Sequence, residues 1–433
     1  MGAVWPGSGA FRGPSGRAGL HYSIDISLLK MSTHTRSTPS TRLPRDAQRL
    51  VVLAESLARS GSRLEDAYWE GLFQAQLVKL LTQKKSDAID TALDHLLAAN
   101  SEAYEILIEQ VETHSESSTL THEGQDYDVL LFCAPIVAWT RYQLPSSYDL
   151  RPVLDTLAEH LHTHIVARDA QVSLLSEMLN FDQMPRSFHE TLEWTQRLGR
   201  AALKQKNENS PLKQAPFSDG MLADARFVIG AIVVPKGGPL FRWQEGAPEA
   251  TISREQCFQG WQDACSQALQ AMFTGCTIEY LQPDAYYISS READRRIRPL
   301  ALKAAATWLQ TAAGLPGNQL RATTVACGET SVEEYRIGFS TSQSADVIYG
   351  CIWPVLSKEE AVADLLDTNG TSIPEEIAAL LKEQGITDVR QLPGLFRPEF
   401  CDDCGAPYFP DPLGEMQHPE LPDEIDVNPL SFH

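Results

Sequence analysis

The densest group of reactive side chains lies near the C-terminus, where two residues separate Cys401 from Cys404 and Gly405 follows. Two thiols at this spacing can bind one metal ion from a tight turn, and glycine accepts the backbone conformation that closes such a turn. His418 is a suitable third zinc ligand, with His433 or a carboxylate as the fourth. The pattern predicts a structural zinc; two free thiols in a turn are the alternative. A redox pair is disfavoured because flanking acids raise a thiol pKa.

A second group of candidate residues lies at the start of an expected helix, where Arg291 and Arg295 fall on neighbouring turns close to Tyr286. Ser289 or Ser290 would cap this helix. In an acidic protein, cationic side chains beside free backbone N–H groups predict a binding site for a small anion. The alternative is pairing of these arginines with acids of the same helix, at the spacing that ion pairs prefer.

A third candidate is a repeated arginine–aromatic–glutamine triplet, which begins at Arg141 and again at Arg242. Each triplet follows an expected strand, and in duplicated α/β units such loops can line a shared cleft. Arg242 and Trp243 would then bind a planar carboxylate or phosphate ligand, with Arg141 in the other copy. Alternatively, each triplet anchors its own loop. For an enzyme, Asp284 or His189 would be the acid–base group.

Composition excludes several classes of function. The chain of 433 residues has 36 basic and 57 acidic residues and a net charge of −21, which argues against nucleic-acid binding and adsorption to anionic membranes. No apolar run approaches the roughly 18 residues of a membrane helix. Eight cysteines in a chain of this size do not form a disulfide framework, so we expect a reduced, soluble, cytoplasmic protein.

The elements that must position these residues change character along the chain. From Pro44 to about Ser117 the apolar periodicity is helical. A strand, helix, strand, helix order then begins near Tyr127 and returns near Phe227, with corresponding elements about 105 residues apart. We interpret this as a duplicated β-α-β-α core with parallel pairing and right-handed crossovers. Added strands follow from Leu320, the last two as an antiparallel hairpin.

The expected fold is therefore mixed α/β: an N-terminal helical region, the duplicated core with added antiparallel strands, and the zinc-knuckle-like tail. Residues 1–43 are expected to be a disordered or mis-assigned extension, with Met31 a natural start. The remaining expected segments are a helical region at 44–120, α/β units at 121–205 and 206–357, and a helix with an acidic tail at 358–433.

Several stretches together carry a family resemblance: Ser60 to Asp66, Thr140 to Tyr142, Pro239 to Glu245, Pro283 to Tyr287, Arg291 to Asp294, Glu334 to Phe339, Asp346 to Gly350 and Cys401 to Gly405. From Pro44 to His433 the chain resembles a bacterial family catalogued as domain of unknown function 2863. The resemblance implies a shared architecture and a cytoplasmic bacterial setting, and it implies no chemistry.

These observations favour a binding or regulatory module whose partner is a small anionic ligand or another protein. The alternative is an enzyme that acts on a small anionic substrate in a cleft between the two α/β units. A cleft that gathers both triplets and the Arg291 helix would favour the enzyme.

Overall fold

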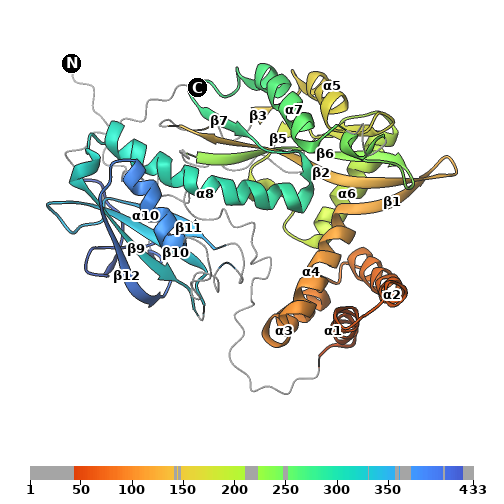
Figure 1. Cartoon of the computed structure of the whole chain (residues 1–433), viewed down its shortest axis with the longest axis horizontal. Coiled ribbons are helices and arrows are strands. Elements are labelled where there is room, and N and C mark those ends of the chain that lie inside the picture. Colours follow the sequence, from red (N-terminus) through yellow and green to blue (C-terminus); the bar gives the residue numbers. More distant parts are fainter. Residues whose placement is uncertain are drawn as a thin grey trace, which may run out of the picture.

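The computed structural model describes residues 43–140, 144, 148–209, 223–246, 252–329, 331–355, 360, 372–402 and 405–422. They form a helical lobe, a six-stranded sheet with helices on its faces, and a four-stranded sheet (Figure 1). The expected mixed α/β class with antiparallel strands is confirmed. Among the described residues, none of the helices is both long enough and apolar enough to cross a bilayer.

The helical lobe comprises α1 (Arg45–Ala58), α2 (Arg63–Thr82), α3 (Ser86–Ala99) and α4 (Ser101–Glu116). Ser62 caps α2 as its sequence suggests, because its side chain accepts a hydrogen bond from the backbone N–H of Glu65. The four helices pack around leucines and other apolar residues with almost no exposure, and α4 leads directly into the first strand.

The larger sheet has the order β1-β2-β6-β4, with β7 and β8 also beside β2. Its strands are β1 (Ser117–His122), β2 (Gln125–Trp139), β4 (Gln171–Leu174), β6 (Ala223–Pro235), β7 (Thr277–Tyr280) and β8 (Asp284–Ala285). The expectation of parallel pairing is wrong, because all of these strand pairs are antiparallel. The two long strands β2 and β6 lie side by side in opposite directions and form the centre of the sheet.

Both faces of this sheet are covered, which explains the continuous apolar character of β2 and β6. Alternate residues of the two strands pack against α5 (Leu154–His164) and α7 (Arg254–Leu269). The others pack against α6 (Phe188–Leu203), α8 (Tyr286–Thr311) and the helical lobe. The sheet is therefore the middle layer of three (Figure 1). Short strands β3 (Tyr148–Asp149) and β5 (Glu177–Met178) pair beside it.

Helix α8 joins the two sheets, because its first half packs on β2 and its second half belongs to the core of the smaller sheet. It begins at Tyr286, earlier than expected, so Ser289 and Ser290 lie inside the helix and do not cap it. It also continues through Pro299.

The smaller sheet has the order β11-β10-β9-β12. Its strands are β9 (Leu320–Cys327), β10 (Glu334–Thr341), β11 (Tyr349–Pro354) and β12 (Asp388–Phe396). The expected β10–β11 hairpin is present, whereas β12 pairs parallel to β9. Helix α10 (Ile373–Glu383) has a capping box at Ser372 and packs beside α8. The short strands β13 (Phe409–Pro410) and β14 (Met416–Gln417) follow.

Candidate functional site

The predicted zinc ligands lie at the C-terminal end of the described chain. Cys401 is half-buried in a hairpin closed by a bridge between Phe400 and Pro407. Its N–H donates to the Ala406 carbonyl at 2.7 Å, and its own carbonyl accepts from the N–H of Gly405 at 2.8 Å. Gly405 has a φ of 70°, the left-handed conformation that such a turn requires.

The structure describes only one of the other two predicted zinc ligands. Cys404 lies outside the described residues. The His418 ring lies 6.3 Å from the ring of Tyr408, measured between centroids, and its Nδ1 lies 3.8 Å from a Glu420 oxygen. Within the described part of the chain, no three His, Cys, Asp or Glu side chains form a metal-sized group. The zinc site therefore stays a prediction.

Arg336 of β10 holds the base of the Cys401 hairpin, a role that the sequence does not reveal. Its side chain is fully buried and donates to the carbonyl oxygens of Glu399 at 2.6 Å and Tyr408 at 2.7 Å. It also pairs with Glu334 at 2.7 Å and lies over the ring of Phe400. The hairpin is thus attached to the smaller sheet by a charge-assisted network.

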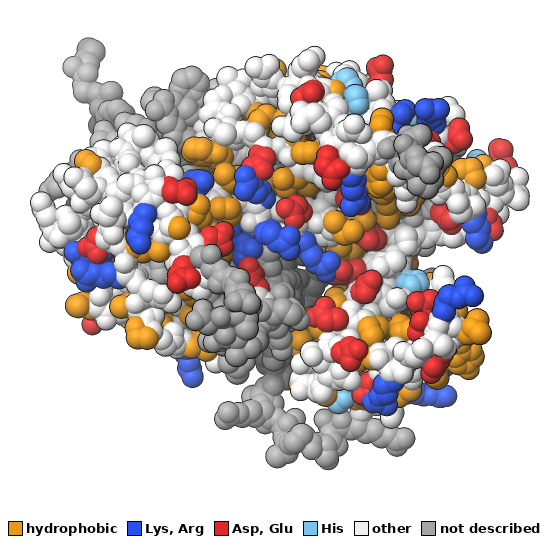
Figure 2. Space-filling model, viewed as in Figure 1, with side chains coloured by type: hydrophobic (Ala, Val, Ile, Leu, Met, Phe, Trp, Pro, Cys, Tyr) orange, Lys and Arg blue, Asp and Glu red, His pale blue; other side chains and the backbone are white. Residues whose placement is uncertain are grey.

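The arginines predicted to bind an anion are engaged in ion pairs. Arg291 pairs with Glu112 of α4, and Arg295 pairs with Glu292 at 2.9 Å. Figure 2 shows basic and acidic side chains side by side over α8. Arg295 agrees with the alternative of pairing within the helix, whereas Arg291 pairs with a different helix. A ligand at either arginine would have to displace an existing carboxylate partner.

The second triplet is anchored to its own surroundings. Arg242 donates from Nε to the His162 carbonyl at 3.2 Å and from its backbone N–H to the Ile165 carbonyl, which ties the loop to the end of α5. Trp243 is stacked on Phe241, with ring centroids 4.4 Å apart. The first triplet, with Arg141, lies outside the described residues.

The two proposed acid–base groups lie in different places. Asp284 is buried, pairs with Arg254, and accepts the N–H of Ala285 at 2.8 Å. The guanidinium carbon of Arg254 also lies over the Trp243 ring, 4.8 Å from its centroid. Arg254 therefore connects Asp284 to the second triplet. His189 is on α6, where its Nδ1 lies 2.7 Å from the Leu81 carbonyl of the helical lobe.

A buried polar cluster, not foreseen from sequence, joins α4, α6 and α8. The Glu116 carboxylate accepts the backbone N–H of Tyr287 at 2.9 Å, which satisfies a free donor in the first turn of α8. The Tyr287 hydroxyl lies 3.2 Å from the Ser115 hydroxyl, which donates to it, and 3.1 Å from the Thr191 hydroxyl. Tyr286, named above as a possible ligand-binding residue, is buried beside Tyr287.

Burial sets the protonation of this cluster. It raises the pKa of Glu116 to about 7, although the hydrogen bond from Tyr287 and the charge of Arg291 oppose the rise. The charges of Glu112 and Asp284 add to it. Cys133 lies next to the cluster on β2, and burial raises the pKa of its thiol to about 12, which keeps it protonated and unreactive.

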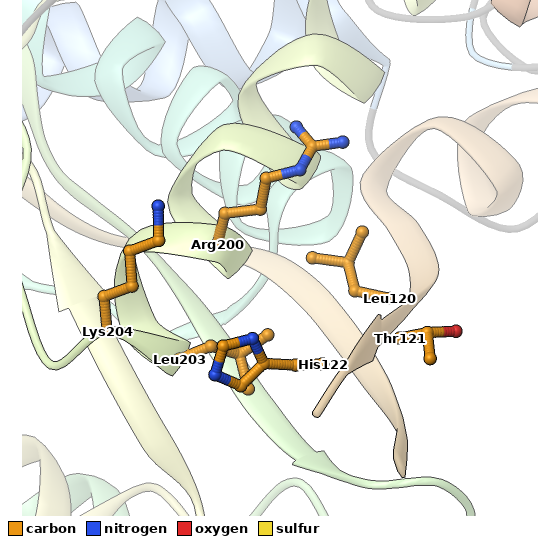
Figure 3. Close-up of a pocket in the computed structure, with 6 residues that line it drawn as sticks. All are labelled: Leu120, Thr121, His122, Arg200, Leu203 and Lys204. Carbon is orange, nitrogen blue, oxygen red and sulfur yellow. The ribbon is translucent and has the colours of Figure 1, made fainter. Parts of the chain in front are cut away.

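A small open pocket lies between β1 and the end of α6, with a volume of about 160 Å³. Its lining residues are Leu120, Thr121, His122, Arg200, Leu203 and Lys204. Figure 3 shows Arg200 and Lys204 extending from α6 to the same side, the His122 ring lying close to Leu203, and Thr121 pointing away. The Thr121 hydroxyl donates to Asp126 at 2.7 Å.

Close packing of α6 fixes the geometry of this pocket. A Cβ atom at Gly199 would lie 2.7 Å from Cγ1 of Val129 and 3.1 Å from Cδ1 of Leu120, so a larger residue would push the helix off the strands. The next residue, Arg200, is thereby held beside β1, and Lys204 follows one turn later. In the described part of the chain neither cation forms an ion pair, and Arg200 donates only to the neutral Gln196 amide, at 3.2 Å.

Comparison with known proteins gives one match. A family model described as a protein of unknown function (DUF2863) matches residues 35–432. No curated protein and no solved structure matches the chain.

Proposed function

The chain belongs to the DUF2863 family, and we propose that it is a binding module that holds a small anion, such as a phosphate or carboxylate group, in the β1–α6 pocket. One observation carries the proposal. In a chain of net charge −21, Arg200 and Lys204, which form no ion pair with a described residue, line one cavity whose six lining residues include no acid. The imidazole of His122 also lines it, but its Nε2 lies 3.9 Å from a Glu123 carboxylate oxygen, so the proposal rests on the two cations. Unneutralised cations at a cavity attract an anion and form strong charge-assisted hydrogen bonds with it.

The shape of the pocket supports a small ligand. Its apolar wall is formed by Leu120 and Leu203. Its polar side chains come from β1 and the end of α6, which pack closely because Gly199 has no side chain. A guanidinium and an ammonium one helical turn apart can both reach the oxygens of one phosphate or carboxylate group.

Binding fits this pocket better than catalysis. Its six lining residues include one imidazole and neither a carboxylate nor a thiol, and the Thr121 hydroxyl is already donated to Asp126. No nucleophile is paired with a base there, as acyl or phosphoryl transfer would require. The arginines on which the enzymatic alternative depends, Arg291 and Arg295, are occupied by carboxylates.

Cations in the last turn of a helix have a competing role, since they stabilise the helix through its dipole. Titration of the protein with inorganic phosphate separates the two roles. If Arg200→Gln and Lys204→Gln lower the melting temperature but leave phosphate affinity unchanged, the cations act on the helix alone and the proposed function fails.

We also propose that the core arose by duplication. Two reciprocal strand pairings support this. Val172 of β4 pairs with Ile232 of β6, while Ile278 of β7 pairs with Ala138 of β2. Further along, Leu179 is bridged to Phe227, and Ala285 is paired with Phe132. Each unit thus pairs its second strand with the long strand of the other. The two contacts of each unit, at Val172 and Leu179 and at Ile278 and Ala285, have the same spacing in both units.

A structural zinc at Cys401, Cys404 and His418 remains our proposal for the tail. The tight hairpin around Cys401 and the left-handed Gly405 support it, since a zinc-binding knuckle needs both. Such a metal would stabilise the tail. It would have no direct role in anion binding at the β1–α6 pocket, which lies on the larger sheet.

A further inference from the structure

Helix α2 has two apolar faces, although a helix on the surface of a lobe needs only one. The inner face, with Phe73, Leu77 and Leu80, is fully buried against the rest of the lobe. The outer face exposes Leu64 at 77%, Tyr68 at 61% and Val78 at 46%. Figure 1 shows α2 at the outside of the lobe, and Figure 2 shows hydrophobic side chains on the surface of that lobe.

The outer residues follow the spacing of a coiled-coil seam. Leu64, Tyr68, Gly71, Ala75 and Val78 are separated by alternating steps of four and three, and all five are exposed. This 4-3-4-3 repeat places one continuous stripe along a helix and is the pattern by which two helices pack together. We call these five residues the α2 seam.

Gly71, in the middle of the seam, has no packing role among the described residues. A Cβ atom built there would meet nothing within 4 Å. Glycine inside a helix costs about 1 kcal/mol relative to alanine. A second helix that crosses at Gly71 would give the glycine a role, because small residues let two helices approach closely.

The sizes of the residues along the seam favour a second copy of the same helix in the antiparallel orientation. Its large residues Leu64 and Tyr68 lie in the first half, Gly71 lies in the middle, and Ala75 and Val78 follow. An antiparallel copy of the same helix that crosses at Gly71 would place Tyr68 of each helix near the small Ala75 of the other, and Leu64 near Val78. A two-fold axis produces this self-complementary contact.

Charge favours the same orientation. Glu65 and Lys79 lie on the same flank of the seam at its opposite ends, two heptads apart. Lys79 forms no ion pair with any described residue. Antiparallel pairing brings Glu65 of one helix towards Lys79 of the other, whereas parallel pairing keeps these two residues two heptads apart along the interface.

We propose that the α2 seam is the docking surface for a second copy of this chain, which binds through its own α2 in an antiparallel, two-fold arrangement.

Sedimentation velocity on the full chain over a concentration series tests the arrangement. We expect a dimer that Tyr68→Glu dissociates. The matched control is Leu413→Glu, which places the same charge at an exposed leucine of the tail and should leave the dimer intact. A wild-type protein that is monomeric at about 50 μM, well above the dissociation constants of stable dimers, would overturn the proposal. A dimer that survives Tyr68→Glu would overturn it too.

Further variants distinguish the loss of this contact from misfolding. Gly71→Ala should favour the helix itself and yet weaken association, because the new methyl group separates the two helices. Glu65→Lys and Lys79→Glu should each weaken the dimer at least several-fold, and the double variant should restore it. A double variant weaker than either single variant would exclude the antiparallel arrangement.

Discussion

The Glu116 carboxylate accepts the backbone N–H of Tyr287 at 2.9 Å, which joins the last residue of α4 to the first turn of α8. The helical lobe is attached to the larger sheet through this buried contact. Glu116 has a pKa of about 7 there, so it changes charge near neutral pH.

Replacement of Glu116 should reduce the pH dependence of stability. Its pKa is raised on folding, so its contribution is complete below the unfolded pKa of about 4.5 and is lost as pH rises through about 7. Glu116→Gln keeps an oxygen acceptor for the Tyr287 N–H but carries no charge. We expect the variant to be more stable than wild type at pH 8, by on the order of 3 kcal/mol, with little difference at pH 4.

Urea unfolding at several pH values measures this effect. The control is Glu102→Gln, an exposed residue in the first turn of the same helix. Parallel pH profiles for wild type and Glu116→Gln would contradict the assignment.

Asp294 of α8 is the second buried carboxyl with this behaviour. Burial raises its pKa to about 8, against the attraction of Arg298 and Arg295 and with the repulsion of Glu360. The folded state must therefore hold a poorly solvated charge above pH 8. Asp294→Asn should raise the melting temperature at pH 9 and change it little at pH 3, below the unfolded pKa of 3.8, where the carboxyl is mostly protonated in both states. A lower melting temperature at pH 9 would show that the charged form is stabilised instead.

Arg336 should determine whether the Cys401 hairpin is ordered. Arg336→Met removes the donors to Glu399 and Tyr408 and leaves Glu334 without its buried partner. We expect a loss of about 3 kcal/mol, as for other broken buried pairs, and faster amide exchange in residues 399–408. Arg397→Met, on an exposed arginine nearby, is the control. Unchanged exchange in the hairpin would contradict this role.

Metal analysis tests the zinc proposal. Protein purified without tags or chelators should contain close to one zinc per chain by elemental mass spectrometry, and Cys401→Ser with Cys404→Ser should remove it. Cys276→Ser, at a half-buried free thiol elsewhere in the chain, should retain it. Metal-free wild-type protein would leave two thiols in a turn.

Strong local patterns made much of the fold predictable. The long apolar runs of β2 and β6, the N-cap serines of α2, α6 and α10, and the β10–β11 hairpin all follow from signals within a few residues. The direction of strand pairing could not be predicted from the sequence. Strands β2 and β6 are each buried on both faces, and such strands have the same continuous apolar sequence in parallel and antiparallel sheets.

Strands β1 and β12 were missed for physical reasons. In β1 the sequence Ser-Ser-Thr-Leu-Thr-His has one apolar residue, so β1 has no hydrophobic alternation. In β12, Pro393 and Gly394 are residues typical of turns. The strand tolerates them because it lies at the edge of its sheet and shifts register between Gln391 and Leu395.

The sequence did not predict the pocket, because one of its walls is β1, which has no hydrophobic alternation. His122 belongs to the missed strand, and Arg200 and Lys204 look like ordinary cations at the end of a helix. Their proximity depends on the β1–β2 hairpin and on the tight contact at Gly199, both of which are tertiary features.

Calorimetric titration with inorganic phosphate tests the central claim most directly. We expect saturable binding to the wild-type protein, weakened at least tenfold in the Arg200→Gln/Lys204→Gln variant, because each lost charge-assisted hydrogen bond contributes about 1.5–3 kcal/mol. The control variant Lys206→Gln/Arg397→Gln removes two exposed charges outside the pocket and should bind as wild type does. Equal affinity in the two double variants, or no binding to the wild-type protein, would contradict the assignment of the β1–α6 pocket as an anion site.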